Sequence, residues 1–98
     1  IWLGAPCMKK VKLHRDMLYL NTLYQSETAK YGAHYIPTSE LLGCSDEKYR
    51  NFLTTSRGNI KVRIGDGIHF SRSGQRIVAE RIISELVILP NVKEVKDE

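Results

Sequence analysis

The sequence predicts an α/β fold with a parallel sheet and a small β-hairpin excursion before a closing helix. A continuous apolar run at residues 1–5 precedes helix-like apolar spacing over residues 13–31, and a short apolar run follows at residues 33–37. A strand–helix–strand order of this kind usually forms a right-handed crossover between parallel strands. The second observation is an apolar-periodic segment from residue 77 onward, which predicts another helix.

Length and composition limit what the chain can be. Its 98 residues make at most one domain, with limited capacity to bury a core. A hydrophobic content of 42% and a charged content of 27% are ordinary for a soluble globular protein. No apolar run approaches the length needed to cross a bilayer, so we expect no membrane span.

The net charge of +4 does not point to a nucleic-acid partner. The densest basic patch consists of Lys9, Lys10, Lys12, His14 and Arg15. Such a patch can contact an anionic polymer, either a nucleic acid or a cell-wall glycan. We favour a solvated loop and helix start, because no aromatic residues interleave the patch as they do in stacking grooves.

The two cysteines, Cys7 and Cys44, leave two arrangements open. They can pair in an exported protein, since each follows a predicted strand and both then lie near one sheet edge. Two separate thiols fit the pattern equally well. No Cys/His spacing suggests zinc. Cys7 is a poor candidate for a nucleophile, because nothing near it would lower its thiol pKa.

The first half of the chain reads as strand, helix, strand and loop. Residues 1–5 resemble a strand covered on both faces, ended by Pro6. The following helix, from Leu13 to Tyr31 with its stop at Gly32, has an apolar stripe at helical spacing that we assign to the core. The stripe comprises Leu13, Met17, Leu20 and Tyr24, with Leu23 beside it. The loop at residues 38–45 then follows the second strand at the carboxyl edge of the sheet, where open α/β sheets place their sites.

The second half reads as hairpin, turn and helix. Residues 49–55 and 60–64 alternate apolar and polar side chains around Arg57-Gly58-Asn59, which predicts a hairpin. Ser71 or Ser73 can cap the last helix. Its apolar face is formed by Ile77, Val78, Ile82, Leu86 and Leu89, and Pro90 stops it. Residues 91–98 are charged and predict a frayed tail.

The segment with the clearest chemistry is the Gly-flanked turn that contains Asp66 and His69. A carboxylate three residues before an imidazole can accept a hydrogen bond from Nδ1–H and leave Nε2 free to take a proton. This makes Asp66 a candidate orienter and His69 a candidate general base. The alternative is a surface turn whose Asp caps the next helix, because short motifs often match by chance. His14 and His34 lack such a partner pattern and are expected to be structural or surface residues.

The residues around this turn favour the catalytic interpretation. The run Arg63-Ile64-Gly65-Asp66-Gly67-Ile68-His69-Phe70-Ser71-Arg72-Ser73-Gly74 resembles the last block of the SGNH (GDSL-like) hydrolases, in the branch with a DG-[IV]-HF-[ST]-x-x-G segment. The resemblance implies a three-layer α/β/α (flavodoxin-like) domain in which the block's Asp and His complete a Ser-His-Asp triad. Carried over to this chain, the catalytic residues are Asp66 and His69.

The nucleophile and oxyanion-hole blocks of that family have no counterpart in the chain, and in family order they precede residue 1. We therefore expect residues 1–90 to be the C-terminal part of an SGNH domain, followed by the tail at residues 91–98. The N-terminal part of the same domain is the expected partner. Alone, residues 1–98 are expected to be inactive.

The resemblance implies a serine esterase acting on an O-acyl or O-acetyl ester, such as one on a cell-wall glycan like peptidoglycan. It implies no metal and no organic cofactor. Exported relatives act in the bacterial envelope, so a periplasmic or otherwise exported location is expected. The alternative from another class is a non-catalytic SGNH-like module that binds a glycan or a protein.

Overall fold

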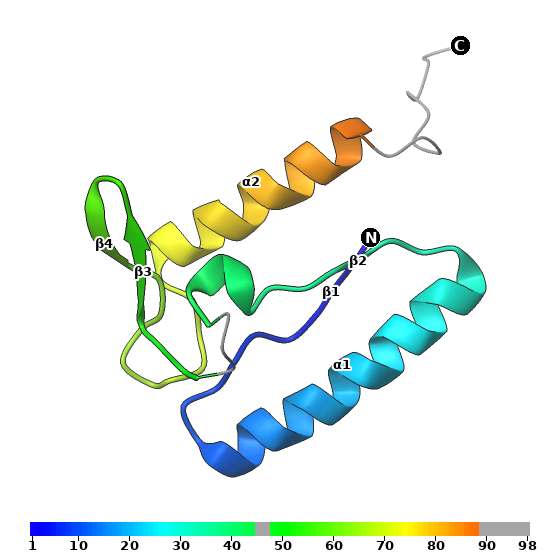
Figure 1. Ribbon diagram of the computed structural model, residues 1–98, viewed down its shortest axis with the longest axis horizontal. Coiled ribbons are helices and arrows are strands. Elements are labelled where there is room, and N and C mark those ends of the chain that lie inside the picture. Colours follow the sequence, from blue (N-terminus) through cyan, green and yellow to red (C-terminus); the bar gives the residue numbers. More distant parts are fainter. Residues whose placement is uncertain (45–47, 89–98) are drawn as a thin grey trace.

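The computed structural model describes residues 1–44 and 48–88. In chain order the elements are β1 (Trp2–Leu3), α1 (Val11–Tyr31), β2 (Tyr35–Ile36), the 3-10 helix η1 (Glu40–Leu42), β3 (Phe52–Thr55), β4 (Gly58–Lys61) and α2 (Arg72–Ile88). In Figure 1, β1 and β2 run between the two helices, and the β3–β4 hairpin lies beside the start of α2. The protein is a small α/β fold with a two-stranded parallel sheet and an antiparallel hairpin.

The predicted strand–helix–strand unit is present. β1 and β2 pair in parallel, with Trp2 opposite Tyr35 and Leu3 opposite Ile36. Both strands are shorter than the predicted ranges 1–5 and 33–37. The expectation that the first strand is covered on both faces is wrong for this structure, where Trp2 is 48% and Leu3 38% exposed. The reason is the small size of the sheet: with two strands of two residues each, the described elements offer little apolar surface that could cover β1 on both faces.

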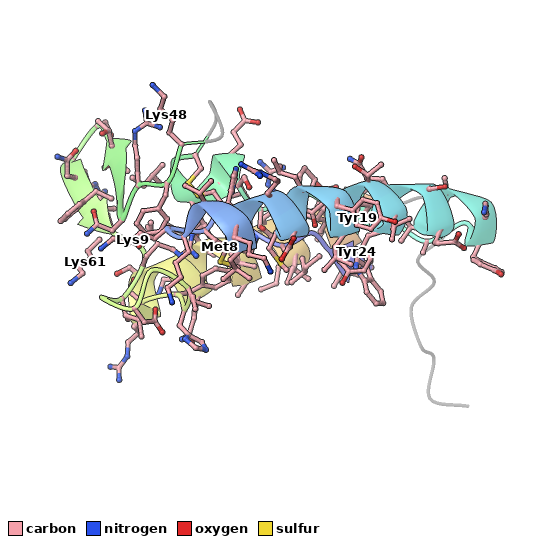
Figure 2. The ribbon with its side chains drawn as sticks, turned by 90° about the horizontal axis from the view of Figure 1, so that it is seen from below. Met8, Lys9, Tyr19, Tyr24, Lys48 and Lys61 are labelled. Carbon is pink, nitrogen blue, oxygen red and sulfur yellow. A yellow bond between two sulfur atoms is a disulfide. The ribbon has the colours of Figure 1, made fainter. Side chains whose placement is uncertain are left out.

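Helix α1 begins two residues earlier than predicted and ends at Gly32 as predicted. Its predicted stripe faces β1 but is only half covered. The Tyr24 ring lies 5.1 Å from the Trp2 ring, and Leu23 is 42% exposed. Figure 2 shows Tyr19 and Tyr24 along this helix, with Met8 immediately before its start. The assignment of the stripe to the core is therefore not confirmed: Leu13, Met17, Leu20 and Tyr24 are half-buried, and the core cluster is formed by residues of other segments.

The β3–β4 hairpin is confirmed, but its turn lies earlier than predicted. Thr55 pairs with Gly58, so Ser56 and Arg57 form the two-residue connection and β4 starts before residue 60. Cross-strand alternation turns Leu53 and Ile60 toward the core, as expected for a hairpin with one buried face.

Helix α2 is capped by Ser71, one of the two predicted candidates. The backbone N–H of Gly74 donates to Ser71 Oγ at 3.1 Å, and the same hydroxyl donates to the carbonyl oxygen of Lys61 at 2.7 Å. The Ser71 side chain therefore accepts a hydrogen bond from an otherwise unpaired N–H in the first turn of α2 and links that turn to the end of β4. Ser73 lies within the helix and is exposed.

One hydrophobic core joins the hairpin, η1 and α2. Its buried members are Leu42, Val62 and Val78. The partly buried residues packed against them are Leu41, Leu53, Ile60, Phe70, Ile77 and Ile82. Leu86 was expected on the same apolar face but is 41% exposed. The core thus supports the segment between β4 and α2, which contains the Asp66–His69 turn.

Several expectations fall on residues that the structure leaves undescribed. Leu89, the helix stop at Pro90 and the charged tail at residues 91–98 lie outside the described residues, as does Ser45 at the end of the loop after β2. Within residues 1–44 and 48–88, neither helix is long and apolar enough to cross a membrane.

Candidate active site

The turn between β4 and α2 is closed by its own backbone. Arg63 and Phe70 form an antiparallel bridge, and the N–H of Ile64 donates to the carbonyl oxygen of His69 at 3.0 Å. Gly67 has a φ of 72°, a left-handed conformation that glycine adopts without steric cost. A Cβ at this position would also clash with the side chain of Lys9. The sequence therefore places a glycine where the turn reverses and touches the loop after β1.

Asp66 and His69 meet within this turn as predicted. One oxygen, Asp66 Oδ1, accepts hydrogen bonds from the backbone N–H groups of Ile68 and His69, each at 2.9 Å. The other oxygen, Oδ2, forms a hydrogen bond with Nδ1 of the His69 ring. An ionised carboxylate accepts but cannot donate, so Nδ1 carries the proton and Nε2 is left as the acceptor.

These hydrogen bonds keep Asp66 ionised. The bond from the His69 side chain, followed by those from the Ile68 and His69 backbone, lowers the pKa of Asp66 from 3.8 to about 2. Each bond is made to the charged form of the carboxylate and therefore favours it. The pair therefore joins an ionised carboxylate to the Nδ1 side of the ring and leaves Nε2 unengaged by Asp66, which is the arrangement that a general base requires.

The His69 side chain is 73% exposed, so this candidate base is accessible from solvent. It borders a pocket of about 150 Å³ that is also lined by Pro6, Met8, Ile68 and Phe70. Two of these residues come from the loop after β1 and the others from the site turn. The pocket is therefore formed where the carboxyl end of β1 meets the segment before α2.

The loop after β1 is held in place by polar contacts that the sequence did not reveal. Ala5 makes two hydrogen bonds with the amide of Asn21, at 2.7 and 2.8 Å. Thr38, which is buried, donates its hydroxyl proton to the carbonyl oxygen of Gly4 at 2.7 Å. Neither contact has a local sequence signal, because each joins residues from different elements.

The remaining histidines have structural partners. Nδ1 of His14 accepts a 3.2 Å hydrogen bond from the N–H of Met8, at the start of α1. Nε2 of His34 lies 3.0 Å from a carboxylate oxygen of Glu85 on α2. The structure brings neither residue to the Asp66–His69 turn.

The two cysteines form a disulfide, which settles the alternative left open above. Cys7 and Cys44 are both buried, with their Cα atoms 6.3 Å apart. The bond links the loop after β1 to the loop after η1, close to the carboxyl ends of both parallel strands. Among the described residues, no cluster of three or more His, Cys, Asp or Glu side chains could hold a metal ion.

The fold and the site define a small α/β protein with an exposed, carboxylate-oriented histidine beside the end of a parallel strand. The family DUF459, described as a protein of unknown function, matches residues 1–85. The chain therefore belongs to this family. A search among curated proteins found no match to the chain. The resemblance to the SGNH hydrolases stays a prediction.

Proposed function

We propose that this chain supplies the Asp–His half of the catalytic triad in an SGNH-type serine esterase. The observation that carries the proposal is the hydrogen bond between Asp66 and Nδ1 of His69, with the ring exposed beside a pocket. The substrate we propose is an O-acyl or O-acetyl ester, such as an acetylated cell-wall glycan.

In the proposed mechanism, His69 first accepts a proton and then donates it in each half-reaction. As a serine hydroxyl attacks the ester carbonyl, Nε2 of His69 takes the hydroxyl proton, and Asp66 stabilises the resulting imidazolium. The tetrahedral intermediate collapses to an acyl-enzyme, and His69 returns the proton to the leaving alkoxide. Water then attacks the acyl-enzyme by the same route and releases the acid.

We place the nucleophile and the oxyanion hole in the N-terminal part of the same domain, which completes a three-layer α/β/α sandwich. Among the described residues one edge of β1 has no strand partner, which supports this placement. The N–H groups of Trp2 and Gly4 donate to β2, at 2.7 and 2.8 Å. Strand geometry therefore turns the intervening N–H of Leu3 toward the opposite edge, where another strand can pair.

Exposed apolar surface supports the same placement. The ring of Trp2 is 48% exposed and borders a pocket of about 370 Å³ that Tyr24, Tyr31 and Ala33 also line. Trp2 belongs to β1, so this apolar surface and the strand edge at Leu3 lie on the same short element. An N-terminal strand and its helix would cover both.

We also propose an exported location, in the periplasm or outside the cell of a bacterium. The Cys7–Cys44 disulfide supports it, because disulfides form and persist mainly in oxidising compartments.

The experiment is an esterase assay of the full-length protein on p-nitrophenyl acetate. His69→Ala should lower kcat by on the order of 10⁴-fold, and Asp66→Asn should lower it by a smaller factor. His34→Ala serves as the matched histidine control and should retain activity near that of the wild type at a temperature where circular dichroism shows it folded. Full activity in His69→Ala would refute the proposal and favour a non-catalytic module that binds a glycan or a protein.

A further inference from the structure

Arg63 is a buried cation at the base of the site turn. It is fully buried, and its guanidinium carbon lies 5.2 Å from the ring centroid of Tyr49 and 5.5 Å from that of Phe70. A buried charge is costly unless its donors are satisfied, and among the described residues Nη1 and Nη2 have hydrogen-bond acceptors whereas Nε has none. The acceptors of its hydrogen bonds therefore indicate which segments this buried side chain holds together.

The guanidinium joins the two segments that form the His69 pocket. Nη1 donates to the carbonyl oxygen of Cys7 at 2.7 Å, and Nη2 donates to the carbonyl oxygen of Ile68 at 2.6 Å. Cys7 lies between two pocket residues of the loop after β1, and Ile68 directly precedes His69. One rigid planar group thus sets the spacing between the two walls of the pocket.

The contacts within the turn cannot set this spacing. Asp66 holds the His69 ring through hydrogen bonds that all lie within residues 66–69. They orient the imidazole relative to its own turn. One backbone hydrogen bond also links the two segments: the N–H of Lys9 donates to the carbonyl oxygen of Gly67, at 3.2 Å.

We propose that Arg63 is a positioning residue that holds the Asp66–His69 turn at a fixed distance from the loop after β1. This inference rests on the proposed function, since the fixed distance places Nε2 where the serine must reach it. A displacement of about 1 Å in such a pair can cost about 10²-fold in rate. Arg63 acts through His69 and touches no reacting atom.

The test compares Arg63→Met and Arg63→Lys in the full-length protein. Methionine keeps much of the aliphatic volume and removes both donors, whereas lysine keeps the charge but lacks the planar fork. Arg76→Met, at an exposed position of α2, is the matched control. We expect kcat on p-nitrophenyl acetate to fall by about 10²-fold in Arg63→Met with KM little changed, to fall less in Arg63→Lys, and to stay unchanged in Arg76→Met.

A second readout does not depend on catalysis. The sulfur of Met8 lies 3.6 Å from Nη2 of Arg63, so the methyl group of Met8 reports on the loop. With methyl-¹³C methionine, and Met8→Leu to assign the signal, Arg63→Met should shift the Met8 resonance and weaken its nuclear Overhauser effects to the His69 and Phe70 rings. The resonance of Met17, on α1, should stay in place.

These readouts separate the two proposals. An unchanged Met8 resonance in Arg63→Met, or a changed one with wild-type kcat, overturns the positioning role. If the wild type has no esterase activity, the proposed function fails, and the Met8 signal alone decides whether Arg63 holds the turn. Should Arg63→Met not fold, the same measurements on Arg63→Lys decide.

Discussion

The Cα of Gly74, in the first turn of α2, lies against the backbone carbonyl of Val62, so that a Cβ at residue 74 would overlap the carbonyl oxygen. The same oxygen accepts a 2.9 Å hydrogen bond from the N–H of Ser71. Val62 is itself fully buried in the core. The start of α2 and the residue that follows β4 are thus packed backbone to backbone, at the two ends of the segment that contains the Asp66–His69 turn.

Gly74→Ala should therefore destabilise the protein. Because the obstructing atom belongs to the backbone, the clash can be relieved only by moving α2 or the strand, which typically costs about 1–3 kcal/mol. The measurement is denaturant unfolding of the full-length protein. Gly65→Ala is the matched control: nothing lies within 4 Å of its added Cβ, so its effect should stay within about 0.5 kcal/mol. Equal stability of the two variants would contradict this packing.

The hydrogen bonds of Asp66 predict a specific acid titration. Because its pKa falls from 3.8 to about 2 in the folded protein, Asp66 favours folding at pH values above 3.8, and this contribution is lost as the pH falls through about 2. The carboxyl ¹³C shift of Asp66 should titrate with a midpoint near that value. In His69→Ala the midpoint should rise, since the largest cause of the shift is removed. An unchanged midpoint in that variant would show that the imidazole does not hold the carboxylate.

Removing the disulfide should lower the free energy of unfolding. Cys7 and Cys44 are separated by 37 residues, and closing loops of such length typically stabilises by about 2–4 kcal/mol. The comparison is between the wild type and a Cys7→Ala/Cys44→Ala variant, each unfolded with and without a thiol reductant. Reductant should destabilise the wild type and leave the double variant unchanged. A wild type indifferent to reductant would argue against the bond.

Residues 1–98 expressed alone should lack esterase activity and should not unfold as a cooperative monomer. Within residues 1–44 and 48–88, β1 pairs on one edge alone and Trp2 is exposed, and an apolar strand without a neighbour on one edge is prone to exchange and association. Hydrogen exchange is the sharpest measurement. The amide of Leu3 should exchange rapidly in residues 1–98 and slowly in the full-length protein.

The same hydrogen-exchange measurement on residues 1–98 can also contradict this prediction. Strong protection of Trp2 and Leu3 in a monomeric, cooperatively folded chain would show that residues 1–98 form a self-sufficient domain. Turnover by that monomer would place the nucleophile within the chain, and Cys7 and the serines would then need to be tested.

The local order of this protein could be predicted from its sequence. The crossover unit, the stop of α1 at Gly32 and the pairing of Asp66 with His69 were predicted correctly, and Ser71 was one of the two predicted caps of α2. Each depends on residues a few positions apart, or on apolar periodicity, so the information is contained in short segments. The hairpin turn was misplaced by about two residues because several polar residues there suit a turn equally well.

The contacts between segments far apart in the chain could be learned only from the tertiary structure. The Cys7–Cys44 disulfide, the bonds of Arg63 to Cys7 and Ile68, and the anchoring of Ala5 by Asn21 all arise from how the elements pack. The incomplete burial of β1 likewise depends on how the elements pack and could not be predicted from the sequence. A residue's type shows which bonds it can make, but its partner across 16 or 56 residues is chosen only when the backbone brings the two together. That is why the Asp66–His69 pair was visible in the sequence, and the pocket that it borders was not.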